Sequence, residues 1–373
     1  MPTPMRLGLF MMPVHPPGRS FSDTLAEDEA KALYADQLGF DELWLGEHFS
    51  ASTEPIPSPL MFMAALAPRT KNLTFGTAVI CLPNHDPVKI AADVAQFDHM
   101  TRGRFMLGIG PGGLYSDFEL FGNADRGVRA RKTMESIRLI QQIWAQDPPY
   151  DFSGEFWNVS LKEAVIPHLG IGFMPKPFQK PGPPISMSVS SRNSPTARIA
   201  AQQGWGIISG NNVPTCAIGS HWQMYSKSCA EAGRPARGDN WRVARTVMVA
   251  PSDDEARDRV FGEHGSSRYF YTYMREVLSR VGLLGVLKPD PDMPDDKATV
   301  DVITEGCVIY GSAKTFLDRL IAFRDEAGPF GTLLMTGLDW SGPNAAWERE
   351  SMRLLAEEVM PKFRQHAMVQ AAE

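Results

Sequence analysis

Eight short apolar runs, each followed by a helix-like segment, constrain the fold of this chain more than any other feature. They occupy residues 6–11, 41–46, 73–80, 104–110, 184–189, 205–209, 241–250 and 331–337. Most are apolar throughout, and continuous apolar strands joined by helices are typical of a parallel sheet covered on both faces. Eight such units, spaced by roughly 30 residues as in βαβ repeats, predict a closed (β/α)8 TIM barrel. An open, doubly wound sheet is the alternative.

Two segments are too long to be ordinary barrel connections, and we expect both to be insertions within one domain that spans residues 1–373. Residues 147–183 are rich in proline, glycine and aromatic side chains, whereas residues 262–306 combine an aromatic cluster with an acidic, proline-containing end. Loops at the C-terminal face of a barrel build its active site. We therefore expect the second insertion, with Tyr269, Phe270, Tyr271 and Tyr273, to form a lid and part of a pocket.

The composition argues against several classes of function. A net charge of −6, without a Lys/Arg-rich run longer than residues 126–132, disfavours nucleic-acid binding. No stretch approaches the ~18 uninterrupted apolar residues of a membrane span, and residues 1–17 are better interpreted as a first core strand than as a secretory signal. The cysteines form no C-x-x-C pair and the histidines have no ligand-like spacing, so we expect neither disulfides nor a metal. A cytoplasmic enzyme is the resulting expectation.

The glycine-rich stretch RGRFMLGIGPGG at residues 102–113 raises the question of a dinucleotide-binding turn. That fingerprint belongs between the first strand and the first helix, whereas this stretch follows the fourth predicted strand. Pro111 removes a backbone N–H that a phosphate would need, and residues 114–128 separate the loop from the next predicted helix. The glycines are better interpreted as a rim where a flat ring lies close to the backbone at the mouth of a barrel.

Three stretches resemble the bacterial luciferase-like, FMN-dependent monooxygenase family: GFDELWLGEHFS (39–50), LTFGTAVICLPNHDPVKIAADVAQFDHMTRGRFMLGIGPG (73–112) and YSDFELFG (115–122). Within that family the chain is most similar to the limonene-monooxygenase-type branch. The resemblance is dense over residues 5–145 and returns at 188–206, 330–340 and 351–363. It implies a barrel that binds FMN at the C-terminal ends of its strands, usually in the reduced form that a separate flavin reductase supplies. It also implies a homodimer.

The same resemblance implies a monooxygenase reaction. Reduced FMN reacts with O2 to give a C4a-(hydro)peroxide, which oxygenates a small, largely apolar organic substrate. His48 falls where these enzymes have a catalytic histidine, and an imidazole there can give or take one proton near neutral pH. The alternative is a histidine that is bonded to a neighbouring carboxylate such as Glu47 and only fills space. Phe49 stands where the family often has a second histidine.

The resemblance also implies where the flavin ring would lie. We expect Glu47, Thr77, Ala78, Gly110 and Gly112 beside the ring, with Asn84 at its edge and Tyr115, together with Phe10, as candidate walls. Residues 77–79 match a segment where relatives have a non-proline cis peptide, an isomer that the sequence does not reveal. The alternatives are an ordinary barrel strand, a turn-forming asparagine and aromatic core residues.

Four residues are expected to bind the FMN phosphate. Arg129 stands at the start of the fourth predicted helix of the barrel, where luciferases have a phosphate-binding arginine, although Arg126 and Arg131 are competing candidates. Ser191 and Ser194 match the serine/threonine pair of the family beyond the fifth strand, and the adjacent Ser190 is a further cofactor-binding candidate. Ser194 and Pro195 independently predict an N-cap and a first helical proline, so a helix N-terminus would face the anion. Pro111 replaces a further phosphate arginine of the luciferases.

Two other functions fit the same barrel. One is a deazaflavin-dependent dehydrogenase or reductase, which would transfer hydride without O2; the other is a non-catalytic relative that binds flavin or aldehyde. The presence of His48 together with the expected phosphate residues argues against the non-catalytic alternative. The partners we expect are the organic substrate, O2 and a flavin reductase, with no nucleic acid and no membrane. The sequence does not decide between electrophilic oxygenation and Baeyer–Villiger insertion.

Overall fold

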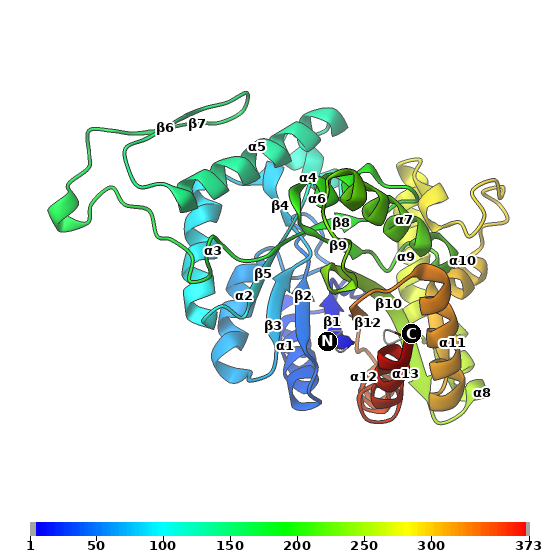
Figure 1. Cartoon of the computed structure of the whole chain (residues 1–373). Coiled ribbons are helices and arrows are strands. Elements are labelled where there is room, and N and C mark those ends of the chain that lie inside the picture. The colour runs from blue at the N-terminus through cyan, green and yellow to red at the C-terminus, as the bar shows by residue number, and fades with distance from the viewer. Residues whose placement is uncertain (1–4, 371–373) are drawn as a thin grey trace.

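The computed structural model describes residues 5–370 and contains a closed parallel barrel surrounded by helices (Figure 1). Its eight strands are β1 (Arg6–Met11), β2 (Glu42–Leu45), β3 (Thr74–Thr77), β5 (Phe105–Gly110), β8 (Ile185–Val189), β9 (Gly206–Ser209), β10 (Trp241–Ala250) and β12 (Thr332–Gly337). Each pairs in parallel with the next around the ring, which closes where β12 pairs with both β1 and β10. The structure thus confirms the (β/α)8 barrel rather than the open sheet.

Helices cover the outside of the barrel, and many begin where the sequence offers a capping side chain. Ser20, Ser58, Asp86, Asp125 and Ser194 each accept a hydrogen bond from a backbone N–H of the helix that follows. The outer helices are α1 (Phe21–Gln37), α2 (Pro59–Leu66), α3 (Pro87–Thr101), α5 (Arg126–Ala145), α6 (Pro195–Gln203), α7 (Thr215–Glu231), α8 (Asp253–Phe261), α11 (Ala313–Ala327), α12 (Asn344–Leu354) and α13 (Met360–Gln370). None of the described helices is both long and apolar enough to cross a membrane.

The interior of the barrel is filled by side chains. The indole of Trp44 is fully buried and packs with a small apolar cluster: Phe10, Met106, Ile208, Ala244 and Leu334. A Cβ on Gly76 would lie 2.4 Å from this indole, so the neighbouring strand carries glycine where the ring passes. The barrel is therefore a packed core without a central channel.

A buried ion pair lies in the same interior. The carboxylate of Glu42 accepts hydrogen bonds from Arg242 Nε at 2.8 Å and Nη2 at 3.1 Å, and from Trp44 Nε1 at 2.7 Å. Burial by itself raises the pKa of Glu42, but the guanidinium of Arg242 outweighs it and lowers that pKa. This pair ties β2 to β10 through the barrel interior.

Two short strands extend the barrel sheet beyond the eight-strand ring that the sequence predicts. β4 (Ile80–Cys81) continues β3 after a cis Ala78–Val79 peptide and pairs with the end of β5. β11 (Val308–Ser312) pairs with the second half of β10 and widens the sheet there. The sequence-based prediction missed β11, because the run at residues 331–337 already completes the eight strands.

The segment at residues 147–183 contains a hairpin of β6 (Tyr150–Ser153) and β7 (Asn158–Leu161) and a short 3-10 helix at Pro167–Leu169. The turn of the hairpin is fastened to α5, since Glu135 accepts hydrogen bonds from the backbone N–H groups of residues 155–157. The residues after β7 extend away from the barrel (Figure 1). Within residues 262–306 lie α9 (Ser266–Arg280) and α10 (Val300–Cys307).

We expect Gly108→Ala to unfold the barrel locally, because a Cβ at residue 108 would lie 1.7 Å from the Thr77 carbonyl oxygen, a backbone atom that cannot rotate away. The replacement should cost about 3 kcal/mol or more of unfolding free energy, measured by chemical denaturation. Gly113→Ala is the matched control, since no atom lies within 4 Å of its Cβ. Equal stability of the two variants would contradict the predicted packing.

Candidate active site

The candidate site is built from the segments that follow β2, β3, β5 and β8, which are neighbours in the barrel. Because all strands are parallel, these segments leave the barrel at the same end, where Figure 1 also shows α4 (Tyr115–Leu120) and α6. The sequence-predicted residues at 47–48, 77–84, 110–129 and 190–194 all belong to these segments.

His48 lies directly after β2 and is mostly buried, with 12% of its side chain exposed. Its Nδ1 atom is 2.9 Å from Glu54 Oε2, an ion-pair distance whose angles fall outside hydrogen-bond geometry. Burial alone lowers the pKa of His48, but the nearby carboxylates of Glu54, Asp117 and Glu47 outweigh it and raise that pKa. The neighbouring carboxylate at Nδ1 is therefore Glu54, not Glu47.

Glu47 performs a different task from the one expected of a flavin contact. Its Oε1 atom accepts a hydrogen bond from the backbone N–H of Cys81 at 2.7 Å and lies 2.9 Å from His85 Nε2. The carboxylate thereby fastens the segment after β2 to β4. Its place as a flavin-binding residue stays a prediction.

Asp117, on α4, holds the residues that follow His48. Its carboxylate accepts hydrogen bonds from the backbone N–H groups of Phe49 and Ser50 and from the Ser50 hydroxyl. The sequence-based prediction did not single out Asp117, although it lies in the YSDFELFG stretch. Buried carboxylates that accept several N–H bonds fix a loop firmly, so the backbone around His48 is held in place from α4.

Thr77 joins β3 to β5 through its side chain. Its hydroxyl donates to the Gly108 carbonyl at 2.7 Å and accepts from the Gly108 N–H at 2.9 Å. Farther along β5, a Cβ on Gly110 would lie 2.8 Å from Val79 Cγ2, and Gly112 has a φ of +87°. Glycine at residue 110 makes room for Val79, and glycine at residue 112 suits the positive φ; the place of both beside a flavin ring stays a prediction.

Asn84 and Arg129 are brought together by a residue that the sequence did not single out. Asn123 donates through Nδ2 to Asn84 Oδ1 at 2.9 Å, and its carbonyl accepts from Arg129 Nη1 at 2.7 Å. Both Asn84 Nδ2 and Arg129 Nε are buried and have no hydrogen-bond partner among residues 5–370. Buried donors are normally paired, so these two atoms fit a cofactor that offers acceptor oxygens.

Ser194 is the N-cap of α6, as predicted, with its hydroxyl accepting from the Thr196 N–H at 3.4 Å and Pro195 in the first turn. Ser191 is partly buried, and its carbonyl lies 3.0 Å from His221 Nε2. Ser190 is exposed. Of the three serines, Ser194 lies at a helix N-terminus, whose free N–H groups attract an anion; the phosphate role of the three stays a prediction.

The two candidate wall aromatics lie in different places. Phe10 is buried in the barrel interior beside Trp44, so it is a core residue. Tyr115 is 55% exposed at the start of α4. Its role as a wall stays a prediction.

The tyrosines of α9 contact β10 and the segment after β1. The Tyr271 hydroxyl donates to Thr246 Oγ1 at 3.0 Å, and the Tyr269 hydroxyl donates to the His15 carbonyl at 3.4 Å. The Tyr273 phenol lies beside Glu54; burial and this carboxylate raise its pKa. α9 thus covers part of the barrel mouth. A cavity of about 240 Å³ lies between the start of α9 and the segment after β12.

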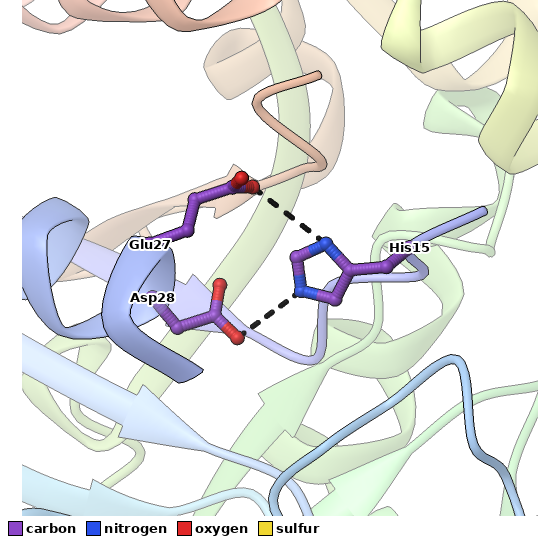
Figure 2. Close-up of side chains that lie close together, drawn as sticks. All are labelled: His15, Glu27 and Asp28. Carbon is purple, nitrogen blue, oxygen red and sulfur yellow. Dashed lines mark hydrogen bonds and ion pairs between the residues drawn. The ribbon is translucent and has the colours of Figure 1, made fainter. Parts of the chain in front are cut away.

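His15 forms a second buried cluster, with Glu27 and Asp28 on α1 (Figure 2). Its Nε2 is 3.2 Å from Asp28, whereas its Nδ1 is 2.7 Å from Asp339 and 3.6 Å from Glu27. Burial lowers the pKa of His15, but hydrogen bonds to Asp28 and Asp339 outweigh it and raise that pKa to about 9.

The geometry of the His15 cluster favours ion pairing over metal binding. Figure 2 shows one ring nitrogen facing Glu27 and the other facing Asp28, so one ion cannot use both nitrogens. Arg19 pairs with Glu27 at 2.7 Å, and Lys31 lies 3.9 Å from Asp28. The positive charges of the protonated His15 ring, Arg19 and Lys31 already balance the carboxylates of this cluster. The sequence-based prediction did not single out this cluster, and its further member Asp339 is 324 residues away from His15.

Comparisons with known proteins agree with this geometry. A family model described as luciferase-like monooxygenase matches residues 5–328. The 4-hydroxyprotoasukamycin monooxygenase of Streptomyces nodosus subsp. asukaensis is 33% identical over 364 residues, which cover 95% of this chain and 91% of that protein. Limonene 1,2-monooxygenase of Rhodococcus erythropolis is 29% identical over 361 residues, which cover 95% of this chain and 86% of that protein.

A solved structure is similar along nearly the whole chain. It is the oxygenating constituent of 3,6-diketocamphane monooxygenase from Pseudomonas putida, in complex with FMN; it has a TM-score of 0.85 and 27% sequence identity, and covers 96% of this chain and 99% of that one. F420-dependent enzymes are more distant matches. These findings confirm the resemblance inferred from the sequence: the chain belongs to the luciferase-like monooxygenase family.

Proposed function

We propose that this protein is an FMN-dependent monooxygenase that uses O2 to oxygenate a small, largely apolar organic molecule. The observation that carries the proposal is the linked set of Asn84, Asn123 and Arg129, which presents two buried, unpartnered donors beside a glycine-lined rim. Membership of the luciferase-like monooxygenase family supports FMN as the acceptor-rich ligand. The relatives named above act on limonene and on diketocamphane, both compact apolar molecules.

Different residues at the barrel mouth would contact the phosphate and the ring of FMN. Arg129, Ser190, Ser191 and Ser194 would hold the phosphate, because a guanidinium and a helix N-terminus both favour an anion. The ring would lie against Thr77, Ala78, Gly110 and Gly112, with the Asn84 amide at its edge and Glu47 and Tyr115 nearby. When bound in the reduced form, FMN supplies the two electrons that activate O2.

The chain itself would position the reactants and control protons. His48 is a single buried imidazole that carries or accepts one proton at the rim. The tyrosines of α9 cover part of the barrel mouth, which would limit the access of water. A separate flavin reductase would supply reduced FMN, since no second nucleotide site is expected from the sequence.

The proposal is tested by binding FMN, reducing it without air and then adding O2. We expect the absorbance to pass through a species distinct from both reduced and oxidised FMN, and an ¹⁸O atom from ¹⁸O2 to enter limonene or diketocamphane. NADH alone should give no product until a flavin reductase is added. Direct return to oxidised FMN without oxygen transfer, or hydride transfer from reduced deazaflavin, would contradict the proposal and favour the alternatives.

The phosphate assignment predicts a selective loss of affinity. Arg129→Leu combined with Ser191→Ala should weaken FMN binding about 100-fold, because charge-assisted and hydroxyl hydrogen bonds of about 3 kcal/mol together are removed. Binding of riboflavin, which lacks the phosphate, should change little. Flavin fluorescence titration measures both. The matched control is Arg138→Leu with Ser160→Ala, two exposed positions outside the proposed site. An unchanged FMN Kd in the first variant would refute the placement.

We also propose a homodimer that works in the cytoplasm. The four free cysteines support a reducing compartment. The projecting residues 162–173 expose Ile166, Leu169, Ile171 and Phe173, and the apolar helix α2 exposes 75% of Met61, so each copy offers an apolar arm and an apolar face. Light scattering should give twice the mass of one chain, and Leu169→Asp should yield monomers. A monomeric wild-type protein would overturn the homodimer. Recovery of the protein in a secreted fraction would overturn the cytoplasmic location.

A further inference from the structure

Three buried carboxylates surround His48, and they are not equivalent. Glu47 is committed to the Cys81 N–H and to His85, and Asp117 is committed to the backbone N–H groups of residues 49 and 50. Glu54 faces the ring itself, with Oε2 2.9 Å from Nδ1. Because the other two acids already have partners, Glu54 is the carboxylate available to act on the imidazole.

The loop that carries Glu54 is held in place by backbone hydrogen bonds. The Glu54 N–H donates to the Ala51 carbonyl at 3.0 Å, and the Glu54 carbonyl accepts from the Ile56 N–H at 3.0 Å. The preceding residue, Thr53, accepts from the His15 N–H at 2.8 Å, which links the loop to the segment after β1. Pro55 further restricts the backbone at Glu54. The carboxylate is thus presented from a rigid support.

Little water can reach the contact between the two side chains. Glu54 is 6% exposed, and the adjoining cavity has a volume of about 10 Å³, which is bordered by His48, Glu54 and Met12. That is room for about one water molecule. In a site with so little solvent, a carboxylate acts on an adjacent imidazole more strongly than it would in water.

The second nitrogen of the ring is in a different situation. Nε2 of His48 makes no hydrogen bond to any residue within 5–370, although part of the side chain is accessible. An acid at Nδ1 fixes the ring orientation and favours the protonated imidazolium, which also carries a proton on Nε2 and can donate it. In oxygenation by a two-electron reductant, one oxygen atom of O2 enters the substrate and the other becomes water. That second oxygen needs protons.

We propose that Glu54 is a positioning residue for His48: it holds Nδ1 so that the ring is kept protonated and Nε2 donates to the departing oxygen. The inference rests on the proposed function for the identity of the proton acceptor. The pairing itself rests on the geometry of the loop after β2. Glu54 touches neither the flavin nor the substrate in this scheme and acts only through the imidazole.

Other titratable groups face this pair from the surrounding elements. They are Glu47 after β2, Cys81 on β4, His85 after it, Asp117 on α4 and Tyr273 on α9. Burial and the carboxylates of Glu47 and Asp117 raise the pKa of the Cys81 thiol. Burial and the Glu54 carboxylate raise the pKa of the Tyr273 phenol, so both groups remain neutral near pH 7. Removal of the Glu54 charge leaves Glu47 and Asp117 in place.

The test is Glu54→Gln, which keeps the size of the side chain and removes its charge. We expect the rate of product formation from the FMN-loaded protein to fall about 100-fold, a typical general acid–base effect, with FMN Kd and substrate KM unchanged. His48 acts when protonated, so activity is lost as pH rises through its pKa. Because the variant lowers that pKa, the alkaline limb of the pH profile should move to lower pH.

A second readout does not depend on turnover. Imidazole ¹⁵N NMR of the cofactor-free protein should show a lower His48 pKa in Glu54→Gln and loss of the fixed tautomer, and Glu54→Asp should restore both in part. Glu155→Gln, an exposed partner of Arg131, is the control and should change nothing.

Several outcomes overturn the assignment. One is an unchanged His48 pKa in Glu54→Gln. Another is a loss of FMN binding that parallels the loss of rate, because such a parallel loss would indicate a structural role for Glu54. If the wild type transfers no oxygen atom, the proposed function fails. The NMR titration then still decides whether Glu54 controls the ring.

Discussion

The packing of Trp44 inside the barrel is the constraint on which the rest of the structure depends. Its indole fills the interior, receives the Arg242 guanidinium 5.0 Å above its ring and donates to Glu42. The strands beside it can approach only because Gly76 and Gly108 have no side chain. The interior therefore has no room for a ligand, and the segments that leave the C-terminal ends of the strands become the place where binding and chemistry can occur.

Buried carboxylates organise that end of the barrel. Glu47 fastens the segment after β2 to β4, Asp117 holds residues 49 and 50 from α4, and Glu54 faces His48. Removal of any one of these would leave N–H donors or an imidazole without a partner in a place that water barely reaches, which is costly. The same arrangement that stabilises the loops therefore presents the His48 imidazole at the end of the barrel that also carries Asn84 and Arg129.

The sequence predicts the barrel well because its strands are buried on both faces and read as continuous apolar runs. It misses β11, because Val308–Ser312 pairs outside the ring and the other eight apolar runs already account for a closed barrel. Buried charge pairs are harder to foresee: Glu42 and Arg242 are 200 residues apart, and His15 and Asp339 are 324 apart. Family motifs point to His48, Asn84 and Arg129. The contacts of Asn123 and Glu54 are recognised only in the folded structure, because the direction of a side chain in a loop does not follow from its position in the sequence.

Two of the buried histidines at this end of the barrel, His15 and His48, differ in the partners of their ring nitrogens. Both rings face carboxylates, and in both the acids raise the pKa against the effect of burial. His15 has acids at both nitrogens, with Arg19 and Lys31 to balance the charge, so its proton is shared within a closed network. His48 has a single acid at Nδ1 and leaves Nε2 without a partner among the described residues. Only an imidazole of the second kind can pass a proton to a bound reactant.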